Sequence, residues 1–194
     1  TTTPDLVFPN CGVLLQARLG ARGCPAFSIE TACSGFIYAL SIADKFIRAG
    51  EVKCALVVGA ETLSRITDRS DRSTAILFGD GAGAVVLRPS AEAGVLSTHL
   101  HADGEYRDLL YSRGGVSRGF LDPETGEADI AIRMAGNEVF KLAVTKLGAA
   151  VDEALAANSL EKSAIDWLIP HQAYIRIIQA MARRLDMPME RVIL

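Results

Sequence analysis

The stretch Ile29-Glu30-Thr31-Ala32-Cys33-Ser34-Gly35-Phe36 decides how the rest of the chain is interpreted, because it places one thiol between an apolar segment and a helical pattern. Residues 25–29 are short, apolar and bounded by turn residues, which predicts a buried strand. Residues 36–47 repeat apolar side chains at helical spacing until Gly50, which predicts a helix. We therefore expect Cys33 in or just before a first helical turn, where free N–H groups and the helix dipole favour a thiolate.

Cys33, one of four cysteines in the chain, has two possible interpretations. Small neighbours on both sides would leave room for a substrate carbonyl to approach its sulfur. The alternative is a buried thiol that acts as one more small apolar residue, which is the usual state of a free cysteine. No two cysteines form a C-x-x-C pair, so the sequence indicates neither a zinc site nor a redox pair, and we interpret Cys11, Cys24 and Cys54 as packed thiols.

Composition limits the class of protein. The chain has 194 residues, of which 49% are hydrophobic and 22% charged, the balance of a soluble globular α/β domain with a sizeable core. No apolar run approaches the ~20 residues that span a bilayer, and residues 1–5 lack a signal-peptide pattern, so we expect a cytoplasmic protein without membrane contact. A formal net charge of −3 argues against a nucleic-acid partner.

The residues around the Cys33 segment predict alternating helices and strands. A helix is expected over 13–19, closed by Gly20, and the apolar run 53–60 predicts a strand buried on both faces of a sheet. Strand, helix and strand together predict a parallel crossover. Residues 76–87 are glycine-rich, but they continue into a strand over 84–87, so we favour a tight turn with close backbone packing over a phosphate-binding loop.

In the second half of the chain, a histidine again lies between a short apolar segment and a predicted helix. The patterns predict strands over 95–100, 130–134 and 191–194, a long loop or hairpin over 103–129, and helices over 136–158 and 175–185. The helix over 136–158 carries an apolar stripe that we assign to the core. A short apolar strand before His171 precedes the last helix, whereas His99 and His101 are interpreted as surface or packing residues because no metal-ligand spacing surrounds them.

The thiol of Cys33 and the imidazole of His171 are both predicted at the carboxyl ends of strands, which suggests that they belong to one catalytic site. Open α/β sheets place their sites at these strand ends, so Cys33 and His171 could meet there. The residues alone then indicate acyl transfer through a cysteine nucleophile, with His171 tuning the thiolate or stabilising charge on a carbonyl oxygen. A purely structural role for His171 remains the alternative.

Four motifs resemble the β-ketoacyl-acyl carrier protein synthase III family of the thiolase superfamily. They are Thr31-Ala32-Cys33-Ser34-Gly35-Phe36, the run from Phe78 to Ala84, the run from Met134 to Lys141, and Trp167-Leu168-Ile169-Pro170-His171-Gln172-Ala173. The resemblance runs along essentially the whole chain. It implies a thiolase-like α/β fold, layered αβαβα, with two related halves over residues 1–88 and 89–194.

The resemblance also implies a reaction and its partners. Cys33 would take an acyl group from an acyl-CoA primer, typically acetyl-CoA, and condense it with malonyl-acyl carrier protein as carbon dioxide leaves. His171, with an asparagine, would hold the thioester oxygen, and the N–H of Cys33 would hold a second oxyanion. This step initiates type II fatty acid synthesis, requires no metal or cofactor, and in the family involves a homodimer.

Binding residues follow from the same resemblance, position by position. Arg72 resembles the arginine that stacks on the adenine of coenzyme A, Phe78 resembles a wall of the acyl pocket, and Phe8 resembles the phenylalanine inserted from a second subunit. The residues that resemble the pantetheine tunnel are Met134, Gly136, Asn137, Phe140 and Ala173. A basic patch for the acidic carrier protein would comprise Lys141, Arg176, Arg183 and Arg184, although solvated surface roles are the alternative for these cations and for Arg72.

Two departures from the family pattern matter. Tyr174 stands where the family usually has asparagine, which changes a polar contact in the tunnel. The family's catalytic asparagine would lie beyond Leu194 and its tryptophan and arginine for coenzyme A before Thr1, so we expect a central portion of a longer enzyme, incomplete at both ends. The alternatives are a synthase III-like enzyme of secondary metabolism with another primer, a non-catalytic carrier-protein-binding fragment, and, more weakly, a cysteine hydrolase.

Overall fold

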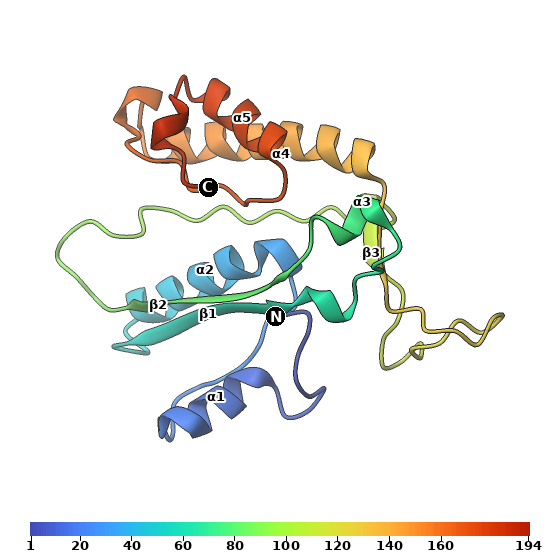
Figure 1. The fold of residues 1–194 in the computed structure, drawn as a ribbon. Helices are drawn as coiled ribbons and strands as arrows, with labels where there is room; N and C mark the ends of the chain where they lie inside the picture. The colour runs from blue at the N-terminus through green and yellow to red at the C-terminus, as the bar shows by residue number, and fades with distance from the viewer. The chain divides into compact units, whose positions relative to one another are not determined.

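The computed structural model describes residues 1–194, and the chain divides into two compact units (Figure 1). The first unit contains residues 1–65 and 79–95, and the second contains residues 66–78 and 96–194. Both units mix helices with short strands. None of the helices has the length and apolar character that a membrane span requires.

The two helices of the first unit lie where the sequence predicts, and each begins one or two residues earlier than predicted. Helix α1 spans Cys11–Leu19, with the Asn10 side chain accepting a hydrogen bond from the N–H of Val13 and Gly20 ending it at φ 66°. Helix α2 spans Gly35–Arg48 and follows a 3₁₀ turn, η1, over Ala32–Ser34. Gly50 adopts φ 77°, a conformation that favours glycine, just after α2 ends. The predicted helices over 13–19 and 36–47 are thus confirmed.

The sheet of the first unit is antiparallel, which corrects the predicted crossover. Strand β1, Ala55–Thr62, pairs with β2, Asp80–Leu87, in a register that runs from Ala55 opposite Leu87 to Thr62 opposite Asp80. Residues 25–29 form no strand, because no neighbouring strand bonds to them along a ladder. Of β1, only Val57 is buried, so the strand is not covered on both faces.

The glycines of residues 79–83 also differ from the prediction. Gly81 and Gly83 lie inside β2, opposite Glu61 and Gly59, and not in a tight turn. A Cβ atom added at either position would meet no atom within 4 Å, so close backbone packing does not explain these glycines. The strand predicted over 84–87 is confirmed as part of β2, which starts earlier and includes these glycines, and no helix opens here as a phosphate loop would require.

The second unit contains three helices and a short hairpin. Helix α3 spans Arg72–Ala75, α4 spans Gly136–Ala157 and α5 spans Ile175–Arg184. Strand β3, Leu110–Ser112, lies within the region predicted as a long loop or hairpin over 103–129 and pairs antiparallel with β4, Ile132–Met134. Single 3₁₀ turns complete the two units at Leu63–Arg65, Gly104–Tyr106, Lys162–Ala164 and Met189–Arg191.

The buried core of the second unit is centred on α5. Ile178 and Ala182 of this helix pack with Val192, and Leu168, Met187 and Met189 surround them. The apolar stripe of α4 is less buried than predicted, because Gly148 is the only buried residue of that helix. The short strand predicted before His171 and the strand predicted over 191–194 reduce to one parallel bridge between Leu168 and Val192.

Residues 95–100 form no strand, because side chains rather than a backbone ladder hold the segment that follows Val95. In the second unit, His99 Nδ1 lies 3.1 Å from one oxygen of Glu153 on α4, and His101 Nε2 lies 2.6 Å from the other. Ser97 bonds to both His99 and Asn158 at 2.8 and 2.7 Å. We name these three side chains, His99, His101 and Glu153, the His–Glu clasp.

Candidate active site

Cys33 is the middle residue of the 3₁₀ turn η1, and only Ser34 separates it from Gly35, the first residue of α2, so it lies just before the helix as the sequence predicts. The residue before it, Ala32, has φ 47°, in the left-handed region that costs a residue with a Cβ atom about 1–2 kcal/mol. This turn redirects the chain from the extended segment into the helix. Backbone strain of this kind concentrates at functional sites, and the apolar pattern around Cys33 did not indicate it.

The electrostatics around Cys33 differ from the predicted thiolate. Although the side chain is partly open to solvent, desolvation by surrounding protein atoms raises the pKa of Cys33, and the negative charge of Glu61 raises it further. Its own backbone N–H favours the thiolate, but this effect is smaller than the desolvation. The resting side chain is therefore a thiol at neutral pH, which corrects the expectation that the helix N-terminus alone would ionise it.

Glu61, near the end of β1, is a group that the sequence reasoning missed. Its carboxylate accepts hydrogen bonds from Thr2 N at 2.7 Å and from the hydroxyls of Thr2 and Thr3 at 3.1 and 2.6 Å. In return, the N–H of Thr62 donates to the Thr3 hydroxyl at 2.7 Å. We name this group, residues 1–3 with Glu61 and Thr62, the Glu61 cluster, and it fixes the chain that leads to Phe8 onto the strand.

His171 lies in the loop between the Leu168 bridge and the start of α5. The side chain of Gln172 holds this loop by donating to the carbonyl of Ile193 at 3.2 Å. Desolvation by the surrounding residues lowers the pKa of His171, so its imidazole is neutral at pH 7. A neutral imidazole has one N–H donor and one acceptor nitrogen.

The predicted tunnel residues gather at the start of α4 and beside the His171 loop. The methyl carbon of Met134 lies 3.6 Å from the position of a Cβ atom added at Gly136. Phe140, one turn into α4, contacts Tyr174 edge to face, with ring centroids 6.3 Å apart. The guanidinium of Arg176 lies over the Tyr174 ring at 5.9 Å. The structure thus brings α4 and the His171 loop together through Phe140 and Tyr174, whereas it shows no such contact for Asn137 or Ala173.

The remaining predicted residues are more dispersed. Arg72 is the first residue of α3 and is exposed, while Asp71 caps the helix by accepting from Ser73 N. Phe78 is half-buried in the second unit. Phe8, in the first unit, is 87% exposed, so no part of this chain covers its ring.

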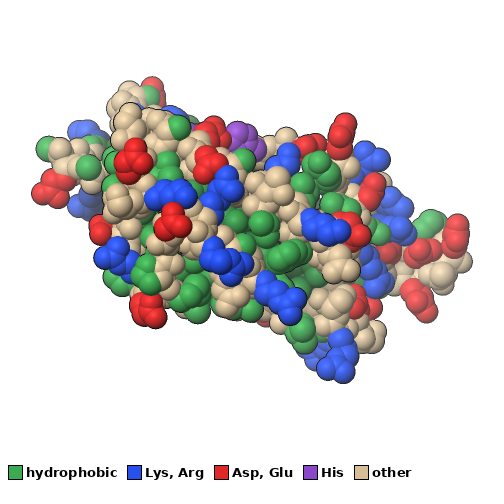
Figure 2. All heavy atoms as spheres, turned by 90° about the horizontal axis from the view of Figure 1, so that it is seen from above, with side chains coloured by type: hydrophobic (Ala, Val, Ile, Leu, Met, Phe, Trp, Pro, Cys, Tyr) green, Lys and Arg blue, Asp and Glu red, His purple; other side chains and the backbone are tan.

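The four predicted basic residues are not equivalent. Lys141, Arg176 and Arg183 are exposed on α4 and α5. Arg184 instead forms an ion pair with Asp152 of α4, and its guanidinium covers Gly148. Figure 2 shows basic and acidic side chains interspersed on the face that it presents, so no broad basic surface marks this face.

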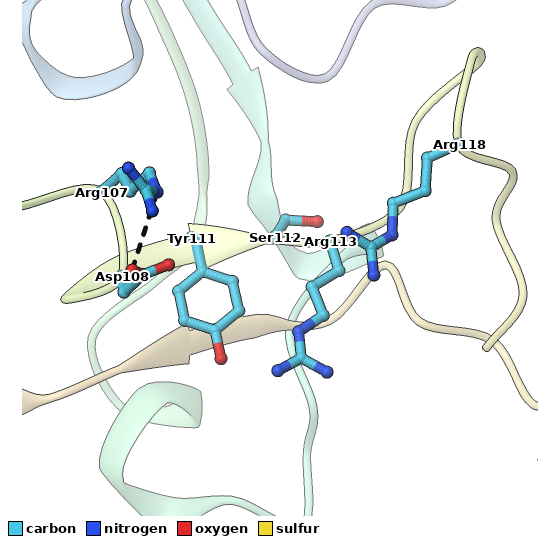
Figure 3. Close-up of a pocket in the computed structure, with 6 residues that line it drawn as sticks. All are labelled: Arg107, Asp108, Tyr111, Ser112, Arg113 and Arg118. Atoms are coloured by element: carbon cyan, nitrogen blue, oxygen red, sulfur yellow. Dashed lines mark ion pairs between the residues drawn. The ribbon is translucent and has the colours of Figure 1, made fainter. Parts of the chain in front are cut away.

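A separate hollow of about 340 Å³ lies within the loop predicted over 103–129 (Figure 3). Arg107 and Asp108 form a 3.7 Å ion pair at one side, and the Arg113 guanidinium lies 5.6 Å from the centre of the Tyr111 ring. None of the predicted site residues lines it. No three His, Cys, Asp or Glu side chains are grouped so that they could hold a metal ion.

Comparison with known proteins gives consistent matches. Residues 27–104 match the family model described as 3-oxoacyl-[acyl-carrier-protein (ACP)] synthase III, and residues 155–194 match the model of its C-terminal part. Beta-ketoacyl-[acyl-carrier-protein] synthase III of Thioalkalivibrio sulfidiphilus is 61% identical over 193 residues, and that of Xanthomonas campestris is 60% identical. In both cases the match covers 100% of this chain and 59% of the relative's length.

A solved structure supports the same relationship. The crystal structure of 3-oxoacyl-[acyl-carrier-protein] synthase III from Aquifex aeolicus VF5 superposes with a TM-score of 0.86 at 44% identity, covering 97% of this chain and 57% of that one. The architecture is therefore that of the thiolase-like α/β fold, as the motifs predicted. Within this fold, the chain belongs to the 3-oxoacyl-[acyl-carrier-protein] synthase III family.

Proposed function

We propose that the chain is the central portion of a β-ketoacyl-acyl carrier protein synthase III that condenses an acyl-CoA primer, acetyl-CoA in the first instance, with malonyl-acyl carrier protein. The observation that supports this most directly is identity of 61% over 193 residues to a synthase III, through the segments that carry both Cys33 and His171. The chain spans 59% of that relative's length, so the activity belongs to the longer protein that contains it. Residues 1–88 and 89–194 are its proposed halves, one for each catalytic residue.

In the first step, Cys33 becomes acylated. Its thiol loses a proton to solvent, and Sγ bonds to the thioester carbonyl carbon of the primer. The bond between that carbon and the sulfur of coenzyme A then breaks, and coenzyme A leaves as its thiol after taking up a proton. The backbone N–H of Cys33, at the start of a helix, is a suitable donor to the transient oxyanion.

In the second step, the malonyl thioester loses carbon dioxide. The electron pair of the broken C–C bond moves onto the adjacent carbon and the thioester oxygen, where His171 donates a hydrogen bond. A neutral imidazole suits this role, because it stabilises the oxygen without supplying an acidic proton that would quench the carbanion. The carbanion attacks the acyl carbonyl, and Cys33 leaves and regains its proton.

Substrate and partner contacts are assigned on the same basis. Arg72, Phe78 and the α4 group Met134, Gly136, Asn137, Phe140 and Ala173 would bind coenzyme A and the pantetheine arm. Lys141, Arg176 and Arg183 would bind the carrier protein, with Arg184 contributing through its ion pair to Asp152. The exposed ring of Phe8 supports insertion into a second subunit, and we propose a cytoplasmic homodimer that needs no cofactor.

Intact-protein mass spectrometry after incubation with a panel of acyl-CoA primers tests the first step. The 194-residue chain and the longer protein that contains it are compared. An acyl adduct that maps to Cys33 supports the proposal and identifies the primer, while free acid as the main product would favour a hydrolase. Carrier-protein binding without an adduct on either protein would favour a non-catalytic scaffold.

Two variants of the longer protein separate the two roles. Cys33→Ser is expected to abolish primer loading, because a serine hydroxyl is a far weaker nucleophile than a thiol. His171→Ala is expected to load normally and to lose decarboxylation of malonyl-carrier protein by about 10²–10³-fold, the usual effect of removing one oxyanion donor. Normal condensation by His171→Ala would contradict the assigned role.

A further inference from the structure

The hydroxyl of Thr31 is the one buried side-chain nitrogen or oxygen without a hydrogen-bond partner. It lies two residues before Cys33, and a Cβ atom added at Gly35, the first residue of α2, would be 3.5 Å from it. Buried hydroxyls in proteins are almost always paired, because an unpaired one forfeits its hydrogen bonds to water. An unpaired hydroxyl two residues before the nucleophile in the chain, packed against the first residue of α2, therefore requires an explanation.

Helix capping does not supply that explanation. Thr31 occupies the N-cap position of η1, where a threonine hydroxyl ordinarily accepts from the N–H two or three residues later. Here its side chain makes no capping hydrogen bond, and its backbone, at φ −124° and ψ 23°, lies outside the extended region that N-caps favour. Only its carbonyl bonds into the turn, accepting from Ser34 N at 3.1 Å.

The strained turn is the second observation at the same place. Ala32, between Thr31 and Cys33, adopts the left-handed conformation at φ 47°. The chain thus retains a strained residue and an unpaired donor in two consecutive positions directly before the thiol. Both features are unfavourable in the resting protein, which is the pattern expected where charge develops only during reaction.

We propose that Thr31 is a positioning residue whose hydroxyl donates a hydrogen bond to the Cys33 sulfur when that sulfur becomes a thiolate. The thiol is a weak acceptor, so the hydroxyl remains unpaired in the resting state, whereas the thiolate is a charged acceptor. The proton released by Cys33 goes to solvent.

The surroundings of Cys33 show why such a donor matters. Desolvation and the carboxylate of Glu61, the charged group that acts on the thiol from β1, both oppose ionisation. The N–H of Cys33 itself is the only hydrogen bond that favours the thiolate in the resting state. A second donor would offset this opposition. The inference rests on the proposed function only in taking Cys33 as the nucleophile.

The test measures Cys33 alkylation by iodoacetamide as a function of pH, resolved by peptide mass spectrometry so that the other cysteines do not interfere. Thr31→Val replaces the hydroxyl with a methyl group of similar size. It is expected to raise the pKa of Cys33 by about one to two pH units and to slow alkylation at pH 8 by about tenfold or more. Thr31→Ser retains the hydroxyl and is expected to restore the wild-type profile.

Thermal stability supplies the second measurement. Because Thr31→Val removes an unpaired buried hydroxyl, it is expected to leave the melting temperature unchanged or raise it by a few degrees. Thr74→Val is the matched control, since Thr74 is fully buried and its hydroxyl donates to Asp71 O at 3.2 Å. This control should lower the melting temperature and leave Cys33 alkylation unchanged.

Two results would overturn the proposal. An unchanged alkylation profile in Thr31→Val would show that the hydroxyl does not act on Cys33. A melting temperature that falls as in Thr74→Val would show that the hydroxyl has a structural partner, such as an internal water. Because alkylation requires neither coenzyme A nor carrier protein, these results remain separate from any failure of the condensing activity.

Discussion

At the scale of single residues, the conformation of Ala32 sets how Cys33 is presented. Ala32 has a left-handed backbone conformation. Glycine adopts this conformation without cost, alanine tolerates it, and β-branched residues strongly disfavour it. The sequence displayed a small residue here, but it could not reveal the sign of φ. This is one of the site features that only the structure supplied.

Ala32→Gly should therefore fold with stability within about 1 kcal/mol of wild type, since relief of strain offsets the greater freedom of the unfolded chain. Ala32→Val should lose about 1–3 kcal/mol or rearrange the turn. Urea denaturation measures the stability, and Cys33 alkylation reports the turn. Equal behaviour of the two variants would mean that the turn relaxes without cost.

His171 predicts a dependence of stability on pH. Because desolvation lowers its pKa in the folded state, the unfolded chain binds a proton at a higher pH than the folded chain does. Unfolding is then favoured as pH falls below the ordinary histidine pKa of about 6.5. His171→Gln should be less sensitive to acid than wild type between about pH 6.5 and 5, measured by urea denaturation at several pH values. Parallel curves for the two proteins would exclude this contribution.

At the scale of elements, the four longer helices could be predicted, whereas the short helix α3 and several strands could not. Helices α1, α2, α4 and α5 follow from side-chain periodicity and end signals, which are local. A strand is defined by a partner distant in sequence. Residues 25–29 and 95–100 have strand-like composition but no ladder partner, and the antiparallel pairing of β1 with β2 depends on that same non-local information.

In the candidate site too, features with local sequence signals could be predicted and features that depend on packing could not. The positions of Cys33 and His171 before helices α2 and α5 could be anticipated from the sequence, because both are marked by local patterns. The raised pKa of Cys33 could not, because it depends on desolvation and on Glu61 from another strand. The unpaired Thr31 hydroxyl is equally invisible, since pairing is a property of the packed chain.

The packing of α1 gives an element-scale prediction. A Cβ atom at Gly12 would lie 2.7 Å from the carbonyl oxygen and 2.8 Å from the nitrogen of Phe27, both backbone atoms that cannot move independently. Gly12→Ala should therefore lose about 1–3 kcal/mol despite the better helix propensity of alanine. Gly94→Ala is the control, because no atom lies within 4 Å of its added Cβ. Denaturation that does not distinguish the two would contradict this packing.

The His–Glu clasp predicts a local effect of charge. His101, and to a smaller extent His99, hold the pKa of the Glu153 carboxyl below its usual range. The clasp therefore stabilises the fold above the ordinary glutamate pKa, and this stabilisation is lost as the pH falls through the lowered pKa. Glu153→Gln should speed limited proteolysis within residues 97–101 at neutral pH, whereas Glu161→Gln, on an exposed turn, should not. Unchanged cleavage would show that other contacts hold the segment.

At the scale of the whole molecule, burial is sparse. Only eight hydrophobic residues are buried, while Leu56 and Val86, which face each other across the β1–β2 ladder, are 45% and 61% exposed. An exposed apolar face on a two-stranded ladder favours association with other chains. The 194-residue chain is thus expected to associate as its concentration rises.

Val86→Lys should increase the monomer fraction of this chain, measured by light scattering over a concentration series, because it places a charge within the apolar face of the ladder. Leu121→Lys adds the same charge at a similarly exposed residue, 61% accessible, in the 103–129 loop and is the control. Equal effects would indicate that net charge, and not the ladder, governs association.

The Glu61 cluster has a consequence for amide hydrogen exchange. The N–H groups of Thr2 and Thr62 donate to a carboxylate and a hydroxyl rather than to a backbone carbonyl. Their exchange with solvent therefore requires side chains to separate, not a helix or a sheet to open. The amides of Thr2 and Thr62 should therefore become deuterated at the same rate. The segment leading to Phe8 then exchanges in step with the end of β1.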